Sequence, residues 1–126
     1  MKHFLLSSTV RSYPPLPYES IKNDILGKAY DLSLVFVGAT RARSINKENR
    51  GKTYVPNVLS FPLDENHGEI YITPEIAKRE SKKFGLSYKG TIGYLFIHGL
   101  LHLKGFDHGP KMERLEKRFI QKYKLS

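Results

Sequence analysis

Three of the five histidines in this chain lie close together near its C-terminal end, at His98, His102 and His108. Residues four positions apart lie on the same face of a helix, about one turn along, so His98 and His102 are expected to point side by side. Gly105 follows the last helical residues, at the place where a left-handed glycine ends many helices. A chain reversal there would return His108 to the same face. The spacing therefore predicts a long helix whose end gathers three imidazoles.

Three neutral imidazoles with a fourth position left to water are typical of catalytic zinc, whereas structural zinc sites are closed by four protein ligands. The sequence contains no cysteine, which excludes thiolate ligands. Histidines four residues apart also occur as ordinary core residues, but a third histidine placed beyond a glycine turn favours a metal site. We therefore expect one Zn²⁺ per chain, held by His98, His102 and His108.

This segment resembles the signature of the YbeY family, the metal-dependent endoribonucleases of ribosomal RNA maturation. The residues that carry the resemblance are His98-Gly99-x-Leu101-His102-Leu103-x-Gly105-Phe106-Asp107-His108 and an earlier block of Asn46-x-x-x-Arg50-Gly51-Lys52, Asn57-Val58-Leu59-Ser60-Phe61-Pro62 and Gly68-Glu69-Ile70. The similarity runs from about Leu32 to the end of the chain, and the part before Leu32 looks short. Pro56 stands where the family usually has threonine, and Thr53-Tyr54 replaces a more polar pair.

The resemblance implies a zinc-dependent, single-strand-directed endoribonuclease, in which metal-bound water attacks the phosphodiester and Arg50 stabilises the transition state. It further implies processing near the 3′ end of small-subunit ribosomal RNA, ribosome quality control, and the ribosome with its small-subunit proteins as partners. The residues alone would leave Arg50 as a solvated loop residue. Asp107 is expected to accept a hydrogen bond from a ligand histidine, or to cap the chain reversal. Asn57 and Ser60 are candidates for lining the cleft, or equally for strand packing.

The chain is strongly basic, with 21 Lys and Arg against 12 Asp and Glu and a net charge of +9. Such an excess attracts polyanions such as nucleic acids. The alternative is a basic, soluble protein that has no polyanionic partner. Lys52, Lys104 and Lys111 are candidates for contacting RNA phosphates, and each alone would be an ordinary surface lysine. No apolar run approaches the length of a membrane span or a secretory signal. The lack of cysteine fits a cytoplasmic protein.

Two other functions are compatible with a histidine zinc site. A zinc peptidase of the helical type needs glutamate directly after the first histidine as its general base, whereas this chain has Gly99. Glu69, Glu113 or Asp107 would have to approach the metal from elsewhere. In a zinc-stabilised RNA-binding module without catalysis, the metal would only pin the C-terminal turn and would leave no open position.

At this length we expect one domain spanning residues 1–126. Apolar periodicity, glycines and prolines predict strands over 4–10, 32–37, 58–61 and 69–73 and helices over 17–28, 40–46, 75–84, 87–103 and 111–124. Thr40 is expected to cap its helix, Pro62 to stop the third strand, and 49–57, with Arg50, to form a loop. The pattern predicts an α+β domain with one mixed sheet of about four strands, a long buried metal-binding helix behind it, and flanking helices.

Overall fold

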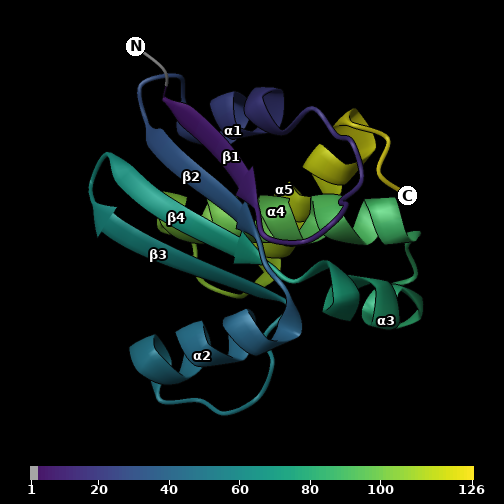
Figure 1. Cartoon of the computed structure of the whole chain (residues 1–126). Helices are drawn as coiled ribbons and strands as arrows, with labels where there is room; N and C mark the ends of the chain where they lie inside the picture. Colours follow the sequence, from purple (N-terminus) through teal and green to yellow (C-terminus); the bar gives the residue numbers. More distant parts are fainter. Residues whose placement is uncertain (1–2) are drawn as a thin grey trace.

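The computed structural model describes residues 3–126 and shows an α+β fold built on one sheet, with α1, α4 and α5 behind it and α2 beside its β3 edge (Figure 1). The strands are β1 (Phe4–Ser8), β2 (Asp31–Phe36), β3 (Val58–Asp64) and β4 (His67–Ile72). The helices are α1 (Tyr18–Leu26), α2 (Ala39–Arg50), α3 (Pro74–Phe84), α4 (Tyr88–Lys104) and α5 (Pro110–Lys122).

The four strands form a mixed sheet in the order β1-β2-β4-β3. β2 lies parallel to both β1 and β4, whereas β3 runs antiparallel to β4. The alternation of buried and partly exposed residues along β2 turns Leu32, Leu34 and Phe36 into the core. The predicted mixed sheet of about four strands is confirmed.

Helix α4 is the centre of the core, and it packs against β3 and β4 on one side and against α1, α3 and α5 on the others. Ile92, Phe96 and Leu100 on this helix are fully excluded from solvent. The Tyr18 ring of α1 meets the Phe96 ring edge-on, with centroids 5.4 Å apart. Within residues 3–126, no helix combines the length and apolar character needed to cross a membrane. The predicted long buried helix is therefore present, and its surroundings fix its position.

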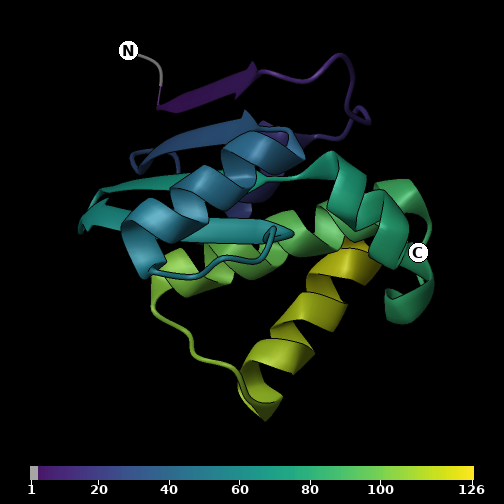
Figure 2. The ribbon, with the colours of Figure 1, turned by 60° about the horizontal axis from the view of Figure 1, so that its bottom comes forward.

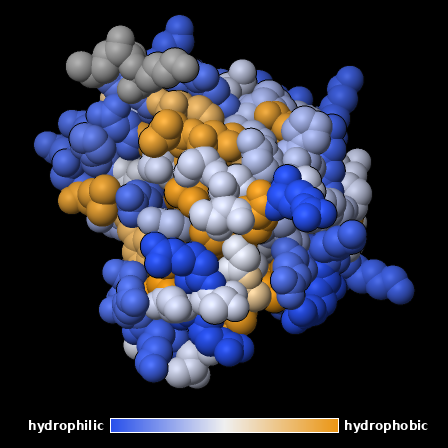
Figure 3. Space-filling model, viewed as in Figure 1, coloured by the Kyte–Doolittle hydropathy of each residue, from blue (hydrophilic) through white to orange (hydrophobic). Residues whose placement is uncertain are grey.

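The other face of the sheet is covered much less than the face that carries α4. Figure 3 views this side and shows apolar side chains scattered among polar ones. Leu5 on β1 and Leu63 on β3 are exposed to 64% and 60%. The sheet therefore has one core face and one face that remains largely open to solvent.

The end of α4 has the predicted glycine reversal. Gly105 has φ +108°, in the left-handed region that disfavours side chains with a Cβ. Its amide and that of Phe106 donate to the carbonyls of His102 and Leu101, both at 3.0 Å, and so satisfy the last turn of the helix. The chain then turns into α5 within a few residues, which is visible below α4 in Figure 2. This tight link places His108 beside the helix that carries the other two histidines.

Helix α2 differs from the expected short helix followed by a loop. It begins after Gly38, so Thr40 lies inside the helix, and it continues to Arg50 before Gly51 ends it with φ +67°. Its last turn carries only polar, exposed residues, so apolar periodicity could not reveal it. Ile45 is buried and anchors the helix to the core. The expectation of a loop at Arg50 was wrong, and this side chain is carried by a helix.

The predicted stop at Pro62 was also wrong, because β3 continues through this residue to Asp64. The pairing with β4 shifts register between Pro62 and Asp64. Proline lacks a backbone N–H and is tolerated on an edge strand or at a bulge, and β3 provides both conditions. The edge position of a strand depends on the whole sheet, so the local sequence could not indicate it.

Replacing Gly105 with alanine tests the reversal. We expect Gly105→Ala to lower the free energy of unfolding by about 1–2 kcal/mol, because a Cβ is strained at this positive φ. Gly105→Asn is the matched control and should cost less, since asparagine tolerates the left-handed region. Urea unfolding of both variants measures the difference, and equal stability of Gly105→Ala and the unmodified protein would contradict the strained geometry.

Candidate metal centre

The three histidines of the C-terminal segment come together beside the end of α4. The ring centroids of His98 and His102 are 4.5 Å apart, and the centroid of His108 lies 4.9 Å from each of them. One ring nitrogen from each residue lies within 4.8 Å of the other two nitrogens. His98 and His102 are partly buried, whereas His108 is exposed. The predicted gathering of imidazoles is confirmed, and the group could hold a metal ion.

The hydrogen bonds of the two helical histidines decide which ring nitrogen carries the proton. His98 Nδ1 lies 2.5 Å from Glu116 Oε2, and His102 Nδ1 lies 3.0 Å from the Phe106 carbonyl oxygen. Both partners act as acceptors, so each Nδ1 carries a proton and donates it. Each neutral ring then presents the lone pair of Nε2 on its other side, which is the atom that binds metals.

The two Nε2 atoms face one another at 3.1 Å. When each ring carries its only proton on Nδ1, two lone pairs face each other at this distance, and a shared cation between them removes their repulsion. In a tetrahedral zinc site with Zn–N bonds of 2.0–2.1 Å, two ligand nitrogens are ~3.3 Å apart. The donor set and this spacing therefore fit a transition metal held by His98, His102 and His108.

Burial is the main reason that the pKa of His102 is lowered from its ordinary value. The neighbouring rings of His98 and His108 lower this pKa further, whereas the hydrogen bond to Phe106 and the charge of Glu116 act in the opposite direction. A lower pKa keeps the imidazole neutral at pH 7. A neutral ring is the form that a metal ligand requires.

The histidines open into a cleft of about 500 Å³ between α4, the β3 edge and the end of α2. It is lined by Arg50, Asn57, Val58, Leu59, Ser60, His98, His102 and His108. Of the two roles expected for Asn57 and Ser60, lining the cleft or packing the strand, the structure shows that both residues line the cleft. Ser60 also donates to the Gly99 carbonyl at 3.1 Å and so ties β3 to α4. The cleft leaves the imidazole group accessible from solvent.

Arg50 reaches this cleft from the last turn of α2. Its Nη1 donates to Asn46 Oδ1 and to the Tyr54 hydroxyl, both at 3.3 Å. Asn46 is completely buried and also donates from Nδ2 to the Tyr54 carbonyl at 3.0 Å. One buried amide therefore holds both the arginine and the following loop. The spacing of the sequence could not place Arg50 here, because the loop after α2 folds back on the helix.

Sequence reasoning missed Glu116 and expected Asp107 in its place. Glu116 is 6% exposed and pairs with His98. Asp107 is exposed, and in the described part of the chain the Nδ1 atoms of His98 and His102 bond to Glu116 and to the Phe106 carbonyl instead. The available signal was that Glu116 falls four residues after Met112, within the core-facing stripe of α5. A carboxylate in such a stripe indicates a buried partner.

The three candidate lysines lie outside the residues that line the cleft. Lys104 Nζ donates to the Ile25 carbonyl at 2.8 Å and so joins the ends of α4 and α1. Lys111 Nζ lies 5.4 Å from the centroid of the Phe106 ring, in a cation–π contact. Lys52 is exposed just after α2. Lys104 is therefore engaged in the fold, although all three lysines are exposed to solvent.

Comparison with known proteins gives the family to which this site belongs. The family model described as Endoribonuclease YbeY matches residues 16–124. The Endoribonuclease YbeY of Bdellovibrio bacteriovorus is 48% identical over 94 residues, which cover 72% of this chain and 63% of the relative. That of Campylobacter jejuni (strain RM1221) is 41% identical over 103 residues, covering 75% and 76%. The chain thus spans less than two thirds of the length of the Bdellovibrio relative.

The fold also has a counterpart among solved structures. The solution structure of TM1509 from Thermotoga maritima superposes with a TM-score of 0.69 at 24% sequence identity, covering 94% of this chain and 87% of that protein. At this identity the likeness concerns the fold alone. The family match extends over α2, β3 and the histidine segment, which together line the cleft. From the family model and the relatives together, we conclude that this chain belongs to the YbeY family.

Proposed function

We propose that this protein is a zinc-dependent, single-strand-directed endoribonuclease. The observation that carries the proposal is the shared cleft, which is lined by Arg50 and by a group of three imidazoles. Metal ligands alone would not select a substrate, since a bound metal can polarise an acyl or a phosphoryl oxygen. Arginine adds the selection, because its planar fork binds phosphate through two parallel hydrogen bonds. The names of the relatives and the net charge of +9 support the same substrate class.

In this proposal, His98, His102 and His108 hold the metal, and zinc bound there would lower the pKa of a coordinated water toward ~7 and supply a nucleophile at neutral pH. Glu116 and the Phe106 carbonyl orient the ligand rings by accepting their Nδ1 protons. Arg50 binds the phosphate and stabilises the negative charge that grows on its oxygens in the transition state. Asn46 limits the movement of the guanidinium, so that little ordering is needed when the substrate binds.

Peptide hydrolysis is less compatible with the site. The residue after the first histidine, where a helical zinc peptidase carries its glutamate, packs against the sheet. A Cβ at Gly99 would lie 2.8 Å from Ser60 Oγ and 3.1 Å from Ile70 Cδ1. A glutamate therefore has no room there. The second alternative, a non-catalytic RNA-binding module, is disfavoured because the group faces an open cleft.

The finer parts of the proposal follow from family membership. We propose ribosomal RNA as the substrate, with processing near the 3′ end of the small-subunit RNA and a part in ribosome quality control. The ribosome and its small-subunit proteins would be the partners, and a cytoplasmic location would follow from such a substrate. Lys52 and Lys111 remain candidate phosphate contacts, whereas Lys104 is a weaker one because its ammonium group is already bonded.

Metal analysis tests the ligand set. Protein purified without a histidine tag should contain about one equivalent of transition metal per chain, and His102→Ala should lose it, because three-ligand sites do not tolerate the loss of one. Metal retention should decline as the pH falls below the ordinary histidine range of about 6.5, since protons compete for Nε2. Burial lowers the pKa of His102, so this decline should begin at lower pH than for free imidazole. A stoichiometry that His102→Ala leaves unchanged would remove this residue from the site.

The pairing of Glu116 with His98 predicts an effect on metal affinity. Glu116→Ala should weaken zinc binding about 10- to 100-fold, the usual effect of losing the carboxylate behind a ligand histidine. Glu116→Gln keeps an acceptor of the same shape and should retain part of the affinity. Competition with a chelator measures both, and thermal melting of the metal-free variants controls for loss of folding. Equal zinc affinity of Glu116→Ala and the unmodified protein would exclude the orienting role.

Substitution of Arg50 separates substrate chemistry from metal binding. Arg50→Glu should reduce cleavage of a single-stranded RNA by about 100-fold or more, because the charge on the phosphate is no longer stabilised. Arg50→Lys should also lose much of the rate, since lysine lacks the fork. Metal content should stay unchanged in both.

The exposed Arg118 on α5 offers a control outside the cleft. Arg118→Glu changes the net charge by the same amount and should leave the cleavage rate close to that of the unmodified protein. An unchanged rate in Arg50→Glu would remove Arg50 from the mechanism. Cleavage of casein but not RNA would favour the peptidase, and tight, salt-sensitive RNA binding without cleavage would favour the binding module.

A further inference from the structure

The loop after α2 carries an aromatic ring that is exposed yet held in place. Tyr54 is 52% exposed, although both its backbone and its hydroxyl group are hydrogen-bonded. Its carbonyl accepts from Asn46 Nδ2 at 3.0 Å, and its hydroxyl accepts from Arg50 Nη1 at 3.3 Å. The backbone and the tip of the side chain are both fixed, while much of the ring remains accessible. Such a ring can form a contact with little loss of side-chain entropy.

The ring lies next to a cleft residue, because its hydroxyl contacts Arg50, which lines the cleft. Arg50 is also the group that we propose to bind the reacting phosphate. The nucleotide adjacent to that phosphate is therefore the candidate for a contact with this ring. Nothing in the core requires an exposed tyrosine here, since Tyr54 is not among the residues that pack in or against the hydrophobic cluster.

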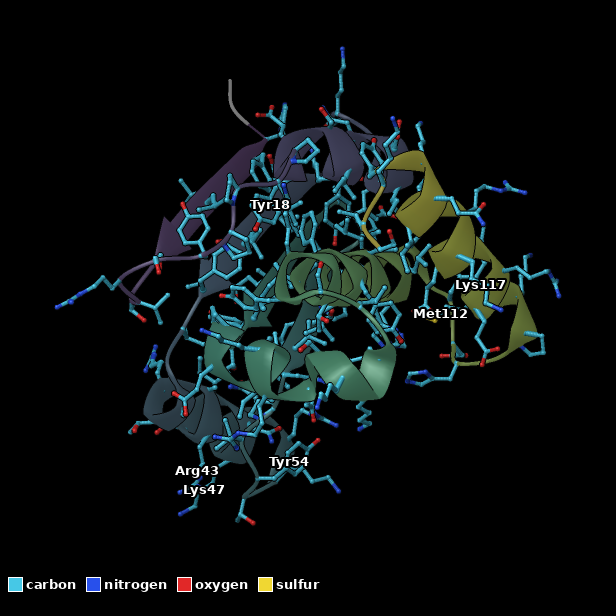
Figure 4. All side chains as sticks on the ribbon, turned by 90° about the vertical axis from the view of Figure 1, so that its right-hand side faces the viewer. Tyr18, Arg43, Lys47, Tyr54, Met112 and Lys117 are labelled. Atoms are coloured by element: carbon cyan, nitrogen blue, oxygen red, sulfur yellow. The ribbon has the colours of Figure 1, made fainter. Side chains whose placement is uncertain are left out.

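Helix α2 continues the positive charge away from the cleft. It carries four basic residues, Arg41, Arg43, Lys47 and Arg50, and one acidic residue, Glu48. Arg43, Lys47 and Arg50 follow the i, i+4, i+7 spacing of one helix face and cover about 10 Å along the axis. Figure 4 shows Arg43 and Lys47 together on the outside of α2 and Tyr54 on the loop that follows this helix. Among residues 3–126, no ion pair occupies these three side chains.

We propose that Tyr54 is a stacking platform for one unpaired RNA base, and that Arg43 and Lys47 bind the phosphates of the strand as it leaves the cleft. An aromatic face beside a row of cations is how proteins bind single strands without reading their sequence, because every base has a π-face. The bases of a duplex are already stacked and cannot cover the ring. This subsite rests on the proposed function, and it gives a physical reason for the preference for single strands.

A second role for the ring can be separated from this one. The Tyr54 hydroxyl contacts Arg50, so loss of the side chain could act through the arginine alone. Tyr54→Phe removes the hydroxyl and keeps the ring, whereas Tyr54→Leu removes the aromatic face and keeps an apolar side chain. Stacking requires the ring, and positioning of Arg50 requires the hydroxyl. The two variants therefore give opposite results for the two roles.

The test measures binding of fluorescein-labelled octaadenylate and of a short RNA duplex to the full chain, zinc-loaded and again in EDTA, where the RNA stays intact. Tyr54→Leu should weaken octaadenylate binding about 5- to 150-fold, which corresponds to the ~1–3 kcal/mol of one base–aromatic stack. Tyr54→Phe should bind within about threefold of the unmodified protein, and duplex binding should be the same in all three. Arg43→Gln with Lys47→Gln should weaken both RNAs and reduce the salt dependence of binding.

The absence of tryptophan from the sequence offers a direct probe. Tyr54→Trp introduces a single reporter, whose emission octaadenylate should quench by stacking. Leu63→Trp is the matched control, because Leu63 is exposed to 60% on the strand end away from the cleft lining, and its emission should not change.

Two affinities would contradict the stacking platform: Tyr54→Leu binding octaadenylate as tightly as the unmodified protein, or Tyr54→Phe binding it as weakly as Tyr54→Leu. Tryptophan emission of Tyr54→Trp that octaadenylate leaves unchanged would also contradict it.

Failure of the proposed function gives a different set of results. A zinc-loaded protein that binds octaadenylate through the ring but cleaves no RNA would support the platform and exclude the nuclease. Cleavage of RNA that Tyr54→Leu leaves unchanged, in rate and in affinity, would support the nuclease and exclude the platform.

Discussion

Two imidazoles whose Nε2 atoms face each other across 3.1 Å are the constraint on which the rest of this structure depends. His98 and His102 can remain in this arrangement only if their Nδ1 protons are accepted elsewhere, and Glu116 and the Phe106 carbonyl do this. Glu116 requires α5 to pack on α4, and Phe106 requires the glycine reversal between them. The helix pair, the turn and the metal group are therefore one unit, in which each part needs the others.

The same helix is also the hydrophobic core of the protein. One side of α4 packs so closely on β3 and β4 that Gly99 has no room for a Cβ. The end that carries the histidines emerges at the β3 edge, where the sheet no longer covers it. A rigid core therefore supports the three histidines, while an open edge leaves them accessible. This combination fits the proposed hydrolytic site, which needs fixed ligands and a free position.

The basic residues of the chain contribute equally to its net charge of +9, but some of them bond within the fold and others lie at the cleft. Lys104 bonds to a carbonyl of α1 and belongs to the fold. Lys122 pairs with Asp24 and joins α5 to α1. Arg50 is held at the cleft by Asn46, in a position from which it can meet a phosphate. The charge that bears on the proposed function is therefore the small part that lies along α2 and the cleft, and the total charge does not reveal it.

The sequence by itself determined the features that depend on neighbours along the chain. The i, i+4 spacing of His98 and His102, the glycine stop at Gly105 and the apolar run of α4 specified a long buried helix with a returning ligand, because helix geometry is local. The strand pattern likewise led to a mixed sheet of four strands. Only the tertiary structure decided that Glu116 supports His98 and that Arg50 reaches the cleft from a helix. These contacts join segments that no periodicity relates, and they exist only after the core has brought α2, α4 and α5 together.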